Sequence, residues 1–117
     1  MRDFLFKDSR KDKVFPVKGA RKGAKEAILE YEVQGAGTLD DADGTQVSLC
    51  RVLLHTGRTH QVRVQFASRK HPLLGDGKYG SRVKGDIHLQ CARIAFAHPR
   101  TKQRMEFSAE KPEKWKI

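Results

Sequence analysis

The chain has 117 residues, enough for one small domain and too few for two. It carries 24 Lys and Arg against 14 Asp and Glu, so its formal net charge is +10. No apolar run approaches the roughly 20 residues of a membrane span, and the N-terminus lacks the apolar core of a signal peptide. We therefore expect no membrane partner, a cytoplasmic location, and contact with a polyanion, of which nucleic acid is the commonest.

The first half of the chain is expected to form strands. Apolar pieces at 4–6 and 14–17 are typical of short or edge strands. Residues 25–34 alternate between apolar and polar side chains, which predicts a half-buried strand. Residues 46–55 are apolar on both faces, which predicts a more central strand paired with 25–34 as an antiparallel hairpin. The glycine- and aspartate-rich residues 35–44 are expected to form the turn between them.

The second half is expected to add one helix and a hairpin. Residues 60–70 fit either a strand or one face of a short helix, with Thr59 as a candidate N-cap. Glycines make 73–84 a loop, and residues 89–97 and 103–108 read as two strands around a proline turn. The resulting fold class is α+β, a mostly antiparallel sheet of about five strands with one short helix.

The two cysteines indicate neither a metal site nor a disulfide framework. Cys50 and Cys91 lie far apart within apolar segments, and neither belongs to a CxxC pair. The five histidines show no ligand spacing with them. We expect two reduced, buried thiols.

Basic residues are densest in the segment 51–82, which holds seven Lys and Arg against Asp76 alone. Within it, residues 56–65 combine glycine, guanidinium, hydroxyl, imidazole and amide groups. If a helix began at Arg63, backbone N–H groups and the Arg58 side chain would converge on one point, as they do around a phosphate or carboxylate. The alternative is a solvated basic face without a ligand.

Two motifs in this segment carry a family resemblance. Their order and spacing closely resemble the ribosomal large subunit pseudouridine synthase family, whose members carry GRTHQ-(apolar)-RV, a short helix, and then HP-(apolar)-GD-xx-YG. The matching residues here are 57–64 (GRTHQVRV), 71–76 (HPLLGD) and 78–80 (KYG). Segments 22–31, 89–99 and 107–109 extend the resemblance to nearly the whole chain.

The resemblance implies an isomerase that converts uridine to pseudouridine in structured RNA, rRNA or tRNA, with no cofactor and no metal. Arg63 matches the family's active-site arginine, which pairs with a catalytic aspartate in an HRLD motif. Such a guanidinium keeps a carboxylate ionised in a partly dry cleft, where its pKa would otherwise rise. The residues expected to contact RNA are Arg58, Thr59, His60, Gln61, Lys70, Lys78 and Arg82.

The sequence also departs from the family pattern, because it contains no HRLD motif. Asp76 matches a structural position, expected to form a turn or cap, and Tyr79 does not match the tyrosine that lines the family's pocket. We therefore expect residues 1–117 to be the C-terminal half of a synthase catalytic domain, monomeric and inactive alone because the catalytic aspartate is missing.

Two other functions compete with this reading. One is a non-enzymatic, basic RNA-binding module built on the same scaffold. The other is a ribosome-bound structural protein without catalytic ancestry, and the two motifs argue against it.

Overall fold

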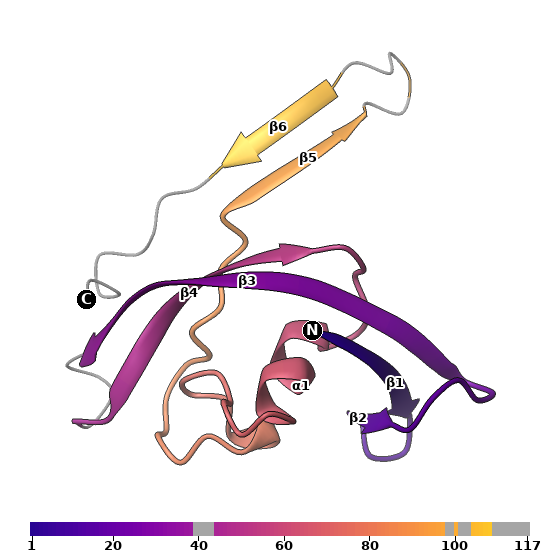
Figure 1. The fold of residues 1–117 in the computed structure, drawn as a ribbon, viewed down its shortest axis with the longest axis horizontal. Helices are drawn as coiled ribbons and strands as arrows, with labels where there is room; N and C mark the ends of the chain where they lie inside the picture. Colours follow the sequence, from indigo (N-terminus) through magenta and orange to yellow (C-terminus); the bar gives the residue numbers. More distant parts are fainter. Residues whose placement is uncertain (39–43, 98–99, 101–103, 109–117) are drawn as a thin grey trace.

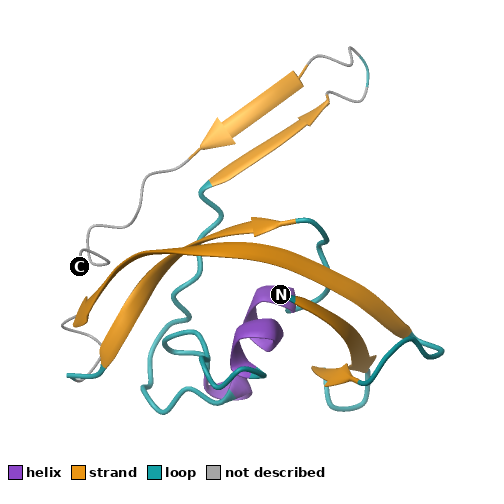
Figure 2. Cartoon of the chain, viewed as in Figure 1, coloured by secondary structure: helices purple, strands orange, loops and turns teal. Residues whose placement is uncertain are grey.

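The computed structural model describes residues 1–38, 44–97, 100 and 104–108, with side chains described outside 93–97 and 104–108. Six strands, one α-helix and one turn of 3-10 helix follow one another along these residues. In chain order they are β1 (Arg2–Asp8), β2 (Lys13–Val17), β3 (Ala24–Thr38), β4 (Gln46–Leu54), α1 (Gln61–Ala67), η2 (Gly77–Tyr79), β5 (Arg93–Ala97) and β6 (Arg104–Ser108). The expected α+β class with one short helix is confirmed (Figures 1 and 2).

The main sheet is antiparallel, with strand order β2-β1-β3-β4. Its long strand β3 arches across the molecule, and α1 lies beneath the concave face of this arch (Figure 1). The predicted hairpin of residues 25–34 with 46–55 is confirmed, with Tyr31 opposite Val52. β5 and β6 form a second antiparallel pair that projects from the sheet (Figure 1).

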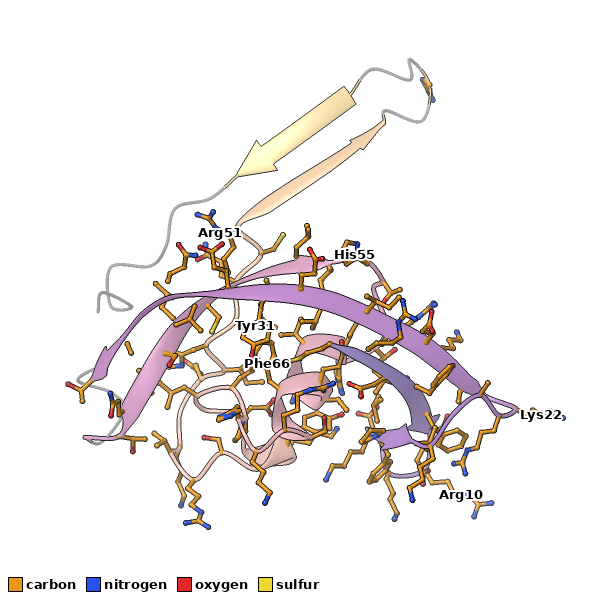
Figure 3. The ribbon with its side chains drawn as sticks, in the orientation of Figure 1. Arg10, Lys22, Tyr31, Arg51, His55 and Phe66 are labelled. Atoms are coloured by element: carbon orange, nitrogen blue, oxygen red, sulfur yellow. The ribbon has the colours of Figure 1, made fainter. Side chains whose placement is uncertain are left out.

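The core lies between the sheet and α1. Ala27 and Leu29 of β3 are fully buried, as their alternation predicts. The helix contributes Val62, Val64 and Phe66 to the same layer. A helix of seven residues is unstable by itself, so this burial is what stabilises it. Figure 3 shows Tyr31 and Phe66 beneath β3, where their rings pack edge to face with centroids 5.2 Å apart.

Two sequence expectations about the sheet are wrong. The strand 46–55 is not central, because β4 is an edge of the described sheet and Leu53 is 58% exposed. The turn predicted at 35–44 starts later, because β3 continues to Thr38 through an irregularity between Val33 and Gly35. An extra residue in one strand lets the ladder continue past a glycine that the pattern assigns to a turn.

The expectation that both thiols are buried is wrong for each cysteine. Cys50 is half-buried, and burial raises the pKa of its thiol. Cys91 is exposed and precedes β5, because that strand starts only at Arg93. The acidic residues 39–43 and most of the predicted turn at 98–101 lie outside the described residues. In the part of the chain that is described, no helix is long and apolar enough to cross a membrane.

Candidate functional site

The GRTHQ loop is closed by the side chain of its glutamine. Gln61 is only 3% exposed. Its Oε1 accepts hydrogen bonds from Thr56 Oγ1 at 2.7 Å and from the Arg58 backbone N–H at 2.9 Å, and its Nε2 donates to the Ile28 carbonyl at 3.1 Å. The amide therefore fastens the loop to β3. The geometry lends no support to the prediction that Gln61 contacts RNA, since its polar atoms bind the protein itself.

The ambiguous segment 60–70 contains the helix α1, which spans Gln61–Ala67 and starts one residue later than the cap prediction requires. The N-cap is His60, whose φ of 52° lies in the left-handed region, and no side chain caps the helix. Thr59 is exposed and was wrongly predicted as the cap. The Gln61 backbone N–H, from which a capping Thr59 hydroxyl could accept, donates instead to the Arg58 carbonyl at 3.1 Å. This start places Arg63 in the first turn of α1.

Arg63 forms a two-pronged ion pair with Asp76. Its Nε donates to Asp76 Oδ2 and its Nη2 to Asp76 Oδ1, both at 2.9 Å. The Asp76 side chain is fully buried, whereas that of Arg63 is 18% exposed. The hydrogen bond to Asp76 raises the pKa of Arg63, and the charge of Asp76 adds to this against the effect of burial. The guanidinium is thus permanently charged, fixed in orientation, and reachable at one edge.

Asp76 is the ion-pair partner of Arg63, which differs from the expected role as a turn former or cap. Asp76 stands at the N-cap of η2, but its carboxylate makes no capping hydrogen bond there. It binds Arg63 instead. The sequence did contain a signal, since Asp76 is the lone acid among seven bases in 51–82, and a buried acid needs such a partner.

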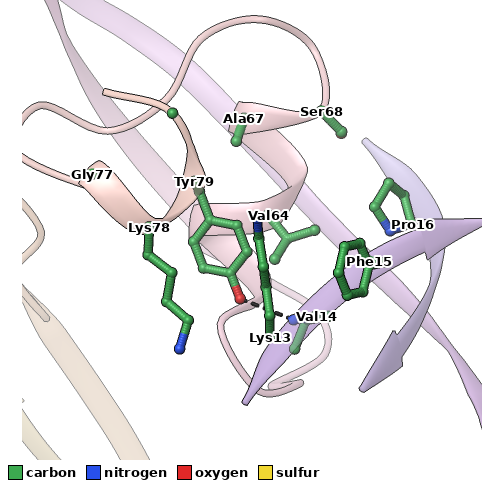
Figure 4. A pocket seen from close by; sticks show the side chains of 11 residues that line it. Lys13, Val14, Phe15, Pro16, Val64, Ala67, Ser68, Gly77, Lys78 and Tyr79 are labelled. Carbon is green, nitrogen blue, oxygen red and sulfur yellow. Dashed lines mark hydrogen bonds between the residues drawn. The ribbon is translucent and has the colours of Figure 1, made fainter. Parts of the chain in front are cut away.

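Tyr79 connects the arginine to the rest of the site. Its ring centroid lies 5.0 Å from Arg63 Cζ, within cation–π range. Its hydroxyl accepts the Val14 backbone N–H at 3.0 Å (Figure 4). The same hydroxyl lies 2.7 Å from His60 Nδ1. The Tyr79 hydroxyl and the His60 ring are thus hydrogen-bonded, and the tautomer of His60 sets which of the two donates. Burial, with the positive charges of Arg63 and Lys78, lowers the pKa of His60 despite two nearby aspartates.

The other predicted RNA-binding residues lie around this network without joining it. Arg58 donates from Nε to the Glu26 carbonyl at 2.9 Å, so it turns toward β3 and does not converge with the loop on one point. Lys78 Nζ lies 3.5 Å from Asp12 Oδ2. Lys70 and Arg82 are exposed, as are Arg58 and Lys78.

Sequence reasoning missed a second ion pair, which joins β1 to the turn that follows α1. Arg69 Nη1 donates to Asp3 Oδ2 at 2.8 Å, and Gln65 Nε2 donates to the same oxygen at 3.1 Å. Burial alone would raise the pKa of Asp3, but the hydrogen bonds from Arg69 and Gln65 and nearby positive charge outweigh it and lower the pKa. The parity of β1 could have indicated the site, because Asp3 shares a face with the buried Leu5.

An open hollow lies beside Tyr79, between β2, α1 and η2 (Figure 4). Three of its cationic or aromatic lining residues are Lys13, Phe15 and Lys78. No three His, Cys, Asp or Glu side chains of the described residues come together as metal ligands. The lining also includes Val14, Val64 and Ala67, so it combines cationic, aromatic and apolar side chains.

The chain is similar to known proteins over much of its length. The family model described as RNA pseudouridylate synthase matches residues 2–68, which include the GRTHQ loop and α1. A protein of Aquifex aeolicus named "Uncharacterized RNA pseudouridine synthase" is 38% identical over 107 residues, covering 82% of this chain and 32% of its own length.

Two relatives have names that specify an RNA. The tRNA pseudouridine synthase C of Pasteurella multocida is 30% identical over 80% of this chain and 44% of its own. The ribosomal large subunit pseudouridine synthase D of Vibrio vulnificus is 38% identical over 54% of this chain and 24% of its own. The chain thus spans less than half the length of these relatives. With its family model matched over more than half of its residues, the chain belongs to the RNA pseudouridylate synthase family.

Proposed function

We propose that this chain supplies the arginine-bearing part of an active site that converts uridine to pseudouridine in structured RNA. The observation that supports the proposal most directly is the state of Arg63, which is charged, held by two bonds to Asp76 and still partly exposed. Family membership gives the reaction class. The substrate, rRNA or tRNA, the cytoplasmic location and a monomeric state belong to the same proposal.

In this reaction Arg63 is a positioning residue that orients a catalytic carboxylate. Isomerisation breaks the bond between the ribose and a base nitrogen, turns the base and forms a bond from the ribose to a base carbon. That carbon then loses its proton, and the freed nitrogen takes one up. A carboxylate must act on the ribose or base, and a guanidinium beside it keeps it ionised and oriented. The hydrogen bonds to Asp76 occupy Nε and Nη2 of Arg63, which leaves Nη1 for a second carboxylate, supplied by an HRLD-bearing segment.

The second candidate is a non-enzymatic RNA-binding module. It is favoured by the same ion pair, because Arg63 already has a carboxylate partner within this chain. Tritium release from RNA labelled at uridine carbon 5 distinguishes the two functions. We expect none from the 117 residues alone, and release from a protein that joins them to an HRLD-bearing segment. An active 117-residue chain would point to a different catalytic aspartate.

Variants of that longer protein test the part played by Arg63. Arg63→Lys keeps the charge but loses the fork, so the single-turnover rate should fall at least about a hundredfold, as expected when a reacting group is misplaced. Lys70→Ala is the matched control, an exposed cation whose loss should weaken RNA binding and leave the rate at saturating RNA nearly unchanged. A parental rate for Arg63→Lys would reduce Arg63 to a phosphate contact.

A further inference from the structure

The β1–β2 hairpin and the turn after it carry a strong positive charge outside the GRTHQ region. Residues 2–25 hold nine Lys and Arg against three aspartates. Each aspartate is already engaged: Asp3 binds Arg69, Asp12 lies beside Lys78, and Asp8 accepts backbone N–H groups of the hairpin turn. The lysines and arginines of the hairpin therefore dominate the field at this end of the sheet, where Figure 3 shows Arg10 and Lys22 pointing outward.

Aromatic rings alternate with these cations. Phe6 and Phe15 are direct cross-strand partners and share one face of the hairpin, while Leu5 and Val14 fill the core from the other face. Lys11 and Lys13 place their ammonium groups 5.7 and 5.5 Å from the Phe15 ring centroid. Phe15 is only partly buried. A partly exposed aromatic ring flanked by two lysine ammonium groups is typical of surfaces that bind single-stranded nucleic acid. Unpaired bases stack on the ring, and the cations bind the phosphate backbone.

The hairpin is continuous with the arginine site. The hollow beside Tyr79 is lined by Lys13 and Phe15 from β2 and by Lys78 from η2 (Figure 4). The Lys13 ammonium lies 5.6 Å from the Tyr79 ring centroid, and Arg63 Cζ lies 5.0 Å from the same centroid. A chain of basic and aromatic groups thus leads from Arg63 past Tyr79 to Phe15.

We propose that this hairpin surface, defined by Lys11, Lys13, Phe15 and Lys78, binds an unpaired RNA segment. One base stacks on Phe15, and the neighbouring phosphates lie against the three lysines. The inference rests on the proposed function, since it takes RNA as the substrate class, and it assigns the site that holds RNA beyond the reacting uridine. A double helix is a poorer ligand for the ring, because its bases are already stacked and paired.

The test measures binding of the 117-residue chain to two fluorescein-labelled probes by anisotropy: a short oligouridylate and an RNA duplex of similar length. Phe15→Leu removes the ring and keeps the apolar bulk, whereas Phe15→Trp keeps a stacking surface. Lys11→Gln/Lys13→Gln removes two cations. Arg51→Gln/Lys84→Gln is the matched control, because it removes equal charge at two exposed positions, and Arg51 lies far from the hairpin in Figure 3. Circular dichroism verifies that each variant is folded.

Phe15→Leu should weaken oligouridylate binding about fivefold or more, the lower end for loss of base–aromatic stacking. It should change duplex binding less, and Phe15→Trp should retain the parental affinity. The lysine double variant should reduce the salt slope for the single strand by about 1.4, or about 0.7 per phosphate contact, and the control double variant by less. The inference is overturned if Phe15→Leu affects neither probe or both equally, if the two double variants behave alike, or if the chain binds neither probe.

These outcomes are separate from those of the proposed function. If the longer protein released no tritium but the hairpin variants still lost RNA affinity, the proposed synthase activity would be wrong and the RNA-binding site would stand. If the longer protein released tritium but the hairpin variants kept the parental RNA affinity, the synthase activity would stand and the RNA-binding site would be wrong.

Discussion

Arg63 is held by two bonds that a lysine cannot reproduce, because a single ammonium cannot match both oxygens of Asp76 in one plane. Arg63→Ala leaves a fully buried carboxylate without its partner, so the free energy of unfolding should fall by about 3–5 kcal/mol. Arg63→Lys should reduce the free energy of unfolding by a smaller amount. Urea denaturation followed by circular dichroism measures both.

The control for this prediction is Arg51→Ala, since Arg51 is exposed and should change the unfolding free energy by no more than about 0.5 kcal/mol. If Arg63→Ala were as stable as Arg51→Ala, the ion pair with Asp76 would contribute nothing to the fold.

Asp3 gives the chain a defined sensitivity to acid. Its pKa lies below the ordinary value of 3.8 in the folded state, so its stabilising effect is complete above that value and is lost as the pH falls through the lower folded value. Asp3→Asn should reduce the unfolding free energy by about 1.5–3 kcal/mol at neutral pH, the range for hydrogen bonds to a charged group. Urea titrations of both proteins at a series of pH values measure the difference.

The difference in unfolding free energy between the parent and Asp3→Asn should be constant from about pH 7 to pH 5 and should disappear below pH 3.8. A gap that stayed constant into strong acid would mean that the carboxylate charge contributes nothing.

Gly75 decides whether the loop that carries Asp76 can form. Its φ is +85°, and an added Cβ would overlap the carbonyl oxygen of Asp86. Because the neighbour is backbone, it cannot move aside as a flexible side chain would. Gly75→Ala should therefore destabilise the chain by more than the roughly 1 kcal/mol of an ordinary glycine replacement.

Gly77→Ala is the matched control, because nothing lies within 4 Å of its Cβ position and its φ is not positive. Thermal melting compares the two variants. Equal melting temperatures would show that the loop can rearrange around the Asp86 carbonyl, and that the Asp76 position does not depend on Gly75.

At the scale of elements, patterns that arise from local alternation were predictable, whereas those set by distant partners were not. Period-two alternation in 25–34 gave the strand, the buried positions Ala27 and Leu29, and its pairing with the next strand. The edge position of β4 could not be predicted, because an apolar pattern indicates that a strand is buried but does not identify the element that packs against it.

The site shows the same division. The GRTHQ motif located Arg63, but its present partner lies thirteen residues away in a loop whose path no local pattern encodes. The N-cap was missed for a related reason: His60 holds its left-handed conformation with its ring bonded to Tyr79, a contact nineteen residues away.

For the molecule as a whole, charge predicts how affinity for RNA depends on salt. The net charge of +10 is spread over the hairpin, the GRTHQ loop and the segment around Lys78, so several phosphates can be contacted at once. We expect weak, sequence-indifferent binding by the 117-residue chain. Each phosphate contact contributes a slope of roughly −0.7 to −0.9 in log affinity against log salt, so three to five contacts give about −2 to −4.5.

The measurement is a salt titration of binding to fluorescent RNAs of unrelated sequence. The slopes should agree among the RNAs, because phosphates carry no sequence information. A slope near zero, or one RNA bound far more tightly than the others at every salt concentration, would contradict the prediction, since binding would then depend on base contacts that the exposed lysines and arginines do not supply. Parallel slopes with a common affinity would instead place the choice of target uridine outside these 117 residues.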